Sequence, residues 1–219
     1  MSWLVGTIVS VLCRLVPATI GIRYWQRYTK GQKAFIILLA YDALGIIIGA
    51  FLAYYYKNNV IVSNIYVIAE VFLLSLFFSE YVQSKSAKKL LTFYPFLFGI
   101  FTITISVGFT GVHQNNPFAT FGSSIFIIVF GAVALAQIVS EDKNLIRQGD
   151  FWIVTGLLSF YLLNVGYLST NKWLIANNSP FLMDLFLILQ YSFYVVNTFY
   201  AIGLSISAFR QKHLQQPQP

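Results

Sequence analysis

Residues 34–56 read AFIILLAYDALGIIIGAFLAYYY, an apolar run in which Asp42 is the one charged side chain. At 1.5 Å per residue, a helix over this run is long enough to cross the roughly 30 Å hydrocarbon core of a bilayer. A barrel strand is excluded because the run lacks the alternation of apolar and polar side chains, over about ten residues, that such strands need. The run therefore predicts a transmembrane helix.

Six further windows of about 20 residues have the same apolar character. With the first run, they place the predicted helices at residues 3–24, 34–56, 60–82, 91–110, 121–140, 151–173 and 181–208. Of the 219 residues, 58% are hydrophobic and 10% are charged, against about 25% charged in a soluble domain, and the mean hydropathy is +0.71. We expect an all-α integral membrane protein in which residues 1–210 form a single seven-helix transmembrane bundle and residues 211–219 a disordered cytoplasmic tail.

Basic residues in the connections indicate how the bundle is oriented. One set of connections, with the C-terminal tail, holds Arg23, Arg27, Lys30, Lys33, Lys85, Lys88, Lys89, Lys143, Arg147, Arg210 and Lys212, and the other set holds Lys57 and Lys172. Because basic connections stay in the cytoplasm, we expect the N-terminus outside and the C-terminus in the cytoplasm. The net charge of +7 is spread over these short loops, so we expect membrane lipid as a partner and no nucleic acid.

Three ionisable side chains fall deep inside the predicted helices. Counted from the outer end, Arg14 lies roughly 16 Å down its helix, Glu70 roughly 15 Å and Asp42 roughly 21 Å. Each such group costs about 2.5–3.5 kcal/mol at the centre of a membrane helix. We therefore expect a buried pair between Arg14 and Glu70, with Asp42 as a third member. The cluster is either structural bracing between the first three helices or a ligand, ion or proton site.

Other polar side chains recur at helical spacing or lie at middle depth, and they predict a polar cavity in the outer half of the bundle. The candidates for this cavity are Asn164, Gln190, Tyr194 and Asn197, and the residues expected to close it are Asn64, Tyr66, Tyr161 and Tyr167. Hydrogen bonds between helices explain the same residues without a ligand, and both interpretations stay open.

Small residues lie on the same face of the second predicted helix as Asp42. Gly45, Gly49 and Ala53 follow it at spacings of three and four residues. Such a stripe lets two helices approach closely. It predicts packing against a neighbouring helix of the bundle or against another protomer, so a homo-oligomer is one of the expected arrangements.

The sequence gives little sign of a cofactor or of catalysis. A retinal Schiff base needs a lysine in the seventh helix, and residues 181–208 contain none. A zinc site needs several histidines, whereas the chain has His113 and His213. We therefore expect no cofactor, no metal and no catalytic residue, although intramembrane carboxylates alone can do acid–base work in some enzymes.

Several short motifs carry a resemblance to a known group. They are Pro17 with Gly21, Asn64-Ile65-Tyr66 followed by Glu70, Phe151-Trp152 with Gly156 and Phe160-Tyr161, and Asn197 with Tyr200-Ala201-Ile202-Gly203. The chain resembles uncharacterised bacterial seven-transmembrane-helix proteins, which are similar to the sensory membrane regions of histidine kinases. The resemblance implies a bacterial cytoplasmic (inner) membrane location and signal reception.

The expected function is accordingly a receptor-like or sensor-like membrane protein of unknown ligand. The sequence ends at Pro219 without a kinase, cyclase or DNA-binding module, so we expect a separate signalling protein as partner. The alternative is a small-solute or ion transporter or channel that uses the Arg14, Asp42 and Glu70 cluster. A purely structural or assembly role is also left open.

Overall fold

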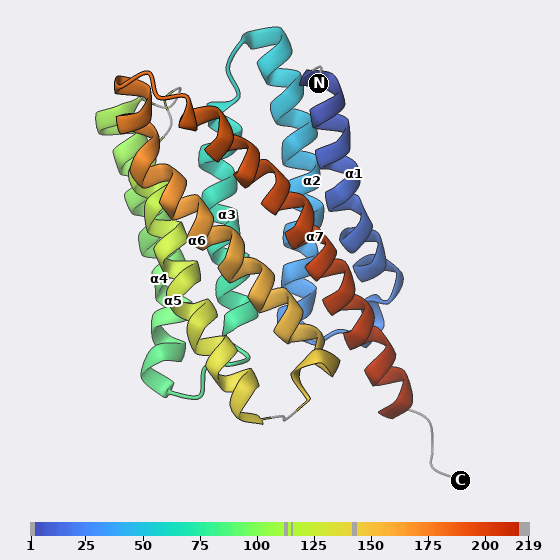
Figure 1. The fold of residues 1–219 in the computed structure, drawn as a ribbon. Helices are drawn as coiled ribbons and strands as arrows, with labels where there is room; N and C mark the ends of the chain where they lie inside the picture. Colours follow the sequence, from blue (N-terminus) through green and yellow to red (C-terminus); the bar gives the residue numbers. More distant parts are fainter. Residues whose placement is uncertain (1–2, 112–113, 115, 142–143, 215–219) are drawn as a thin grey trace.

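A computed structural model describes residues 3–111, 114, 116–141 and 144–214 of the chain. In these residues the chain forms seven α-helices and no strand (Figure 1). The helices are α1 (Trp3–Arg23), α2 (Lys30–Tyr56), α3 (Val60–Phe78), α4 (Lys85–Ile105), α5 (Pro117–Glu141), α6 (Gly149–Ala176) and α7 (Phe181–Leu214), with the short turns η1 (Trp25–Arg27), η2 (Ser106–Thr110) and η3 (Leu145–Arg147). The expected all-α fold, with seven helices long and apolar enough to cross a membrane, is confirmed.

The helices extend beyond the apolar windows because polar residues continue them. α2 begins at Lys30 rather than at residue 34, since Thr29 and Gln32 form a capping box in which each side chain accepts a 3.2 Å hydrogen bond from the other's backbone N–H. α7 continues to Leu214 and so includes Lys212, beyond the apolar span that ends at Arg210. The expected disordered tail is therefore helical up to Leu214, and residues 215–219 lie outside the described residues.

Six of the helices pack as a closed ring. α1 contacts both α2 and α7, and the ring continues through α3, α5 and α6, while α4 packs outside it against α3 and α5. The N-terminus and the C-terminal end of α7 lie at opposite ends of the bundle (Figure 1). The end that holds Val60 and Phe181 is termed the upper end, and the end that holds Lys30 and Gly149 the lower end.

The most tightly packed part of the core lies in the lower half of the bundle. Its largest fully buried side chains include Phe35, Ile36, Leu39, Val71, Leu74, Phe77, Phe78, Ile153, Leu157 and Leu204. In every apolar window less than half of the residues are buried inside the bundle. The remaining apolar side chains face outward, as they do on a surface that lipid covers.

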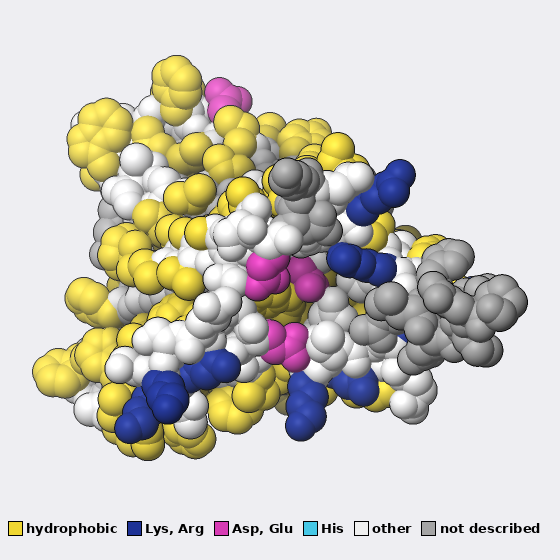
Figure 2. Space-filling model, turned by 90° about the horizontal axis from the view of Figure 1, so that it is seen from below, with side chains coloured by type: hydrophobic (Ala, Val, Ile, Leu, Met, Phe, Trp, Pro, Cys, Tyr) yellow, Lys and Arg dark blue, Asp and Glu magenta, His cyan; other side chains and the backbone are white. Residues whose placement is uncertain are grey.

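Polar side chains tie the helices together at the lower end. Glu80, which follows α3, accepts a hydrogen bond of 2.6 Å from Thr29 Oγ1 at the start of α2. Gln32 Nε2 donates to Asp150 Oδ1 at 2.7 Å and to Ser207 Oγ at 3.1 Å, which joins α2 to α6 and α7. Figure 2 shows this end, with acidic side chains near the middle of the face and lysines and arginines around them.

Two further contacts fix α7 at the lower end. The Tyr28 hydroxyl donates a hydrogen bond of 2.9 Å to the Leu204 carbonyl, and burial raises the pKa of Tyr28 to about 12, so the hydroxyl stays protonated at neutral pH. Gly149 of α6 lies directly against α7, where a Cβ atom would overlap Ser207 Oγ and the Gly203 carbonyl. The lower ends of α6 and α7 therefore have no room for a larger residue at Gly149.

Candidate functional site

A cavity of about 230 Å³, termed the central cavity, lies inside the ring. Every ring helix contributes to its wall. Its polar lining consists of Arg14, Asp42, Ser63, Tyr66, Glu70, Thr120, Ser123, Tyr161, Asn164 and Tyr200. The cavity extends upward to Ser63 and Thr120, in the first turns of α3 and α5, and the tightly packed lower core lies beneath it.

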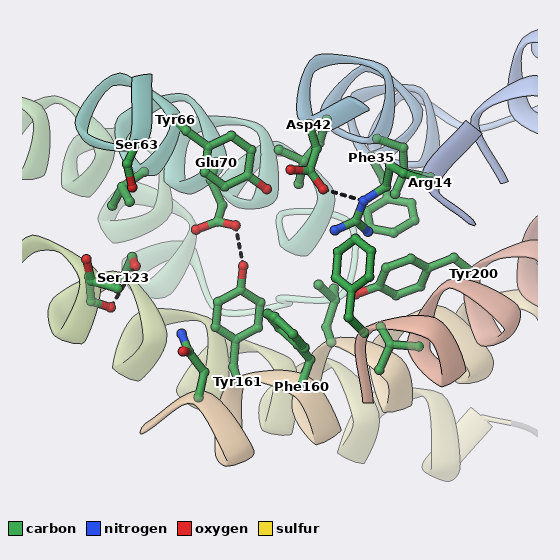
Figure 3. A pocket seen from close by; sticks show the side chains of 18 residues that line it. Arg14, Phe35, Asp42, Ser63, Tyr66, Glu70, Ser123, Phe160, Tyr161 and Tyr200 are labelled. Carbon is green, nitrogen blue, oxygen red and sulfur yellow. Dashed lines mark hydrogen bonds and ion pairs between the residues drawn. The ribbon is translucent and has the colours of Figure 1, made fainter. Parts of the chain in front are cut away.

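Arg14 enters the central cavity from α1 and is held by partners on α2 and α7. Its guanidinium forms an ion pair with Asp42 (Figure 3) and donates a hydrogen bond of 3.0 Å to Asn197 Oδ1. Its Cζ atom lies 4.6 Å from the ring centroid of Phe193 and 5.8 Å from that of Tyr200. Only 8% of Arg14 is exposed, so these contacts compensate a charge that water scarcely reaches.

The predicted pairing of Arg14 with Glu70 is wrong, because the ion-pair partner of Arg14 is Asp42. α1 packs against α2 and α7, whereas α3 lies on the far side of α2. Equal depth in the membrane was the reason for choosing Glu70, but depth does not say which helix is adjacent. The three ionisable groups nevertheless all line the same cavity.

Glu70 is held by neutral hydroxyl groups rather than by a cation. Tyr161 of α6 donates its hydroxyl hydrogen bond to Glu70 Oε1, and the hydroxyl of Tyr66 points into the space between Glu70 and Asp42 (Figure 3). The Tyr66 ring is fixed in turn by stacking on Tyr41, with 5.8 Å between centroids and 5° between planes. Glu70 is 4% exposed, so it is a deeply buried carboxyl group at the cavity wall.

The two expected asparagines have different places in the site. Asn164 lines the central cavity, and its Nδ2 donates a hydrogen bond of 3.4 Å to Ser124 Oγ. Asn197 lies beside Arg14: its Nδ2 donates to the Phe193 carbonyl at 2.7 Å, which leaves Oδ1 to accept from Arg14. Asn197 therefore positions Arg14.

Other expected site residues lie away from the central cavity. Asn64 Nδ2 donates a hydrogen bond of 3.3 Å to the Gln114 carbonyl near the upper end. Gln190 Nε2 donates to the Tyr194 hydroxyl at 3.1 Å, one turn along the same helix. Neither these three residues nor Tyr167 belongs to the cavity lining.

Part of the cavity wall was not expected from the sequence. The residues concerned are the polar Ser63, Thr120 and Ser123, the aromatic Phe35, Phe160, Phe193 and Tyr200, and the aliphatic Leu38, Leu39, Val67, Leu157 and Val196. Thr120, Ser123 and Ser124 carried a usable signal, since they are polar residues at helical spacing in an otherwise apolar segment. The aromatic residues carried none, because aromatic side chains are as common on the outward face of these helices as inside.

A second hollow of about 320 Å³, termed the upper groove, lies between α1, α2 and α3. Gly45, Gly49 and Ala53, which were expected to bring α2 close to a neighbour, line this groove. A Cβ atom at Gly45 would lie 4.0 Å from the Tyr66 ring, which is an ordinary contact. The small residues therefore leave space beside Tyr66 and Asp42, which together with Ser63 line both hollows.

The central cavity offers groups for noncovalent recognition. It presents the Glu70 carboxyl group, phenolic and aliphatic hydroxyls, and aromatic ring faces around a small volume, a lining typical of ligand sites. Within the described ranges, no group of three or more His, Cys, Asp or Glu side chains is placed to hold a metal ion. Comparisons of the chain with protein-family models, with curated proteins and with solved structures find no match.

Proposed function

We propose that this chain is a receptor-like membrane protein that binds a small ligand in the central cavity and relays binding to a separate protein through the packing of its helices. The observation that carries the proposal is the position of the cavity, since all six ring helices line it. A ligand there lies within a wall to which every ring helix contributes. A ligand that prefers one arrangement of the ring over another shifts the protein toward that arrangement.

The rival function is a small-solute or ion transporter or channel that uses the same charged residues. The packing beneath the cavity argues for the receptor. Phe35 and Leu157 line the cavity on its lower side, and Leu74, Phe77 and Leu204 are completely buried in the core of the lower half. A solute that left toward the lower end would have to separate this close-packed layer, whereas a receptor needs access from one end alone.

The proposal includes an orientation and a location. We place the upper end outside the cell and the lower end in the cytoplasm of a bacterium, with the bundle in the inner membrane. Support comes from the arginines and lysines around the lower end (Figure 2), since such residues favour the cytoplasmic side. The ligand then reaches the cavity from outside, and the partner protein, or a second copy of the chain, contacts the cytoplasmic side.

Reporter fusions test the orientation. A reporter that is active only in the cytoplasm is expected to work when it is attached after Pro219. The same reporter inserted between Gly111 and Asn116, at the upper end, is expected to be inactive. The reverse pattern would refute the orientation.

Ligand binding is tested on the purified chain in nanodiscs, by recording thermal unfolding against a panel of small anionic, neutral and cationic solutes. At least one solute is expected to raise the melting temperature in a saturable way. Ser123→Phe, which places a ring in the cavity wall, is expected to remove this effect. Val129→Phe is the matched control, because Val129 is exposed on the same helix. Binding that is absent, or that Ser123→Phe leaves unchanged, would contradict the proposal.

Transport is tested with the same solute in proteoliposomes. A receptor is expected to give no flux above that of empty vesicles. Flux that wild-type protein supports and Ser123→Phe abolishes would instead identify the chain as a transporter.

A further inference from the structure

The charges that line the central cavity do not cancel. Arg14, Asp42 and Glu70 are its ionisable groups apart from tyrosines. Arg14 and Asp42 neutralise each other as an ion pair. An ionised Glu70 therefore leaves the cavity with one negative charge, which a buried site tolerates poorly unless a cation joins it or the carboxyl group takes up a proton.

Arg14 is not free to supply that cation to Glu70. Its guanidinium is engaged by Asp42 on one side and by Asn197 on another, and the ring of Phe193 lies over it. The groups that do contact the Glu70 carboxyl are hydroxyls, which donate hydrogen bonds but carry no charge. A cationic occupant of the cavity supplies the positive charge that an ionised Glu70 needs, in place of the proton that the carboxyl group holds when the cavity is empty.

The walls favour an organic cation over a metal ion. Six aromatic residues line the cavity, namely Phe35, Tyr66, Phe160, Tyr161, Phe193 and Tyr200. Ammonium groups are attracted to the faces of such rings. A divalent metal ion would need several oxygen ligands with more than one carboxylate, and only Glu70 is outside the ion pair. At about 230 Å³ the cavity is smaller than most ligand pockets, which restricts the occupant to a small molecule.

We propose that the central cavity binds a small organic monocation, with its ammonium group beside the Glu70 carboxylate and its carbon groups against the rings of Phe160 and Tyr161. This proposal rests on the proposed function, because it assigns a ligand class to the same cavity. An anionic ligand would meet the charge of Glu70 with no unpaired cation to offset it.

The test uses the purified full chain in nanodiscs of phosphatidylglycerol, in phosphate buffer, so that neither lipid nor buffer supplies an amine. Methylammonium and tetramethylammonium are titrated by calorimetry, with sodium and acetate at equal ionic strength as comparisons. We expect the ammonium ions to bind saturably and the comparison ions not to bind. Glu70→Gln is expected to weaken binding by about tenfold or more, because it keeps the shape and removes the charge.

Two further variants test whether ammonium binding depends specifically on the charge of Glu70 and on the aromatic rings of the cavity wall. Asp184→Asn removes an exposed carboxylate on α7, outside the cavity, and is expected to leave the affinity within about twofold. Phe160→Leu keeps an apolar wall of similar bulk without the ring face, and is expected to weaken tetramethylammonium binding several-fold. This variant keeps the test valid if Glu70→Gln does not fold.

The outcomes separate this proposal from the one on which it rests. If acetate or a neutral solute binds in the cavity and the ammonium ions do not, the ligand class is wrong and the receptor stands. If ammonium ions bind in a Glu70-dependent way and cross proteoliposome membranes, the ligand class stands and the receptor is wrong. Equal affinity in wild type and Glu70→Gln, or no ammonium binding, would overturn the inference.

Discussion

Replacing Arg14 by leucine tests the ion pair at the centre of the bundle. The change leaves the Asp42 carboxylate, whose side chain is 14% exposed, without its cation. Removing one partner of a buried ion pair costs about 3–5 kcal/mol. The hydrogen bond to Asn197 and the contact with Phe193 are lost as well. The losses of the ion pair, the hydrogen bond and the ring contact are not additive, because all three belong to the same buried guanidinium group. We therefore expect a total loss of about 3–5 kcal/mol in the free energy of unfolding.

A double-mutant cycle isolates the pair from the other contacts of Arg14. Arg14→Leu combined with Asp42→Leu removes both charges together, so it is expected to recover a large part of the loss seen in Arg14→Leu alone. The coupling energy of this cycle is expected to be about 2–3 kcal/mol. The matched cycle pairs Arg14→Leu with Glu70→Leu, where no ion pair exists, and is expected to give less than about 1 kcal/mol.

Unfolding of each variant is followed in the same detergent by far-ultraviolet circular dichroism, and the free energies are compared at one temperature. Size-exclusion profiles confirm that every variant is monodisperse before it enters a cycle. A larger coupling for Arg14 with Glu70 than with Asp42 would refute the assignment of the ion pair. Additive losses in both cycles would show that Arg14 stabilises the bundle through Asn197 and the aromatic rings alone.

Three further predictions concern the lower end of the bundle. Gly149→Ala forces a Cβ atom against the Gly203 carbonyl of α7 and is expected to cost about 3 kcal/mol, because backbone cannot easily move aside. Gly45→Ala, in the upper groove, is the control: it has room and is expected to change stability by less than about 1 kcal/mol. Equal melting temperatures of the two variants would contradict this contrast. Gln32→Leu leaves Asp150 without a hydrogen-bond donor from α2 and is expected to lower the free energy of unfolding, measured by thermal denaturation, by about 1–3 kcal/mol. A loss below about 0.5 kcal/mol would show that this hydrogen bond is dispensable. The pKa of Tyr28 is near 10 in the unfolded chain and about 12 in the folded one, so the free energy of unfolding falls as pH rises through this window. Tyr28→Phe is expected to flatten this fall in an alkaline titration, and to cost about 1 kcal/mol at pH 7 because the hydrogen bond to the Leu204 carbonyl is lost. An unchanged pH profile would contradict the prediction.

The sequence by itself determined the number of helices and the depth of the buried charges. Whether a segment such as residues 34–56 can cross a membrane depends on its own length and apolar content, so no other part of the chain is needed to predict it. Depth is equally local, because it is obtained by counting 1.5 Å per residue along one helix. This is why Arg14, Asp42 and Glu70 were expected at one level, and all three line the central cavity.

Only the tertiary structure decided which of these groups meet. The neighbours of a side chain depend on the order of helices around the ring and on the rotation of each helix about its axis, and both follow from packing between segments far apart in sequence. Arg14 therefore pairs with Asp42 of the adjacent α2, and Glu70 is held by Tyr161 of α6. The same packing puts Asn197 of α7 beside Arg14, a contact between residues at opposite ends of the chain that spacing along one helix cannot reveal.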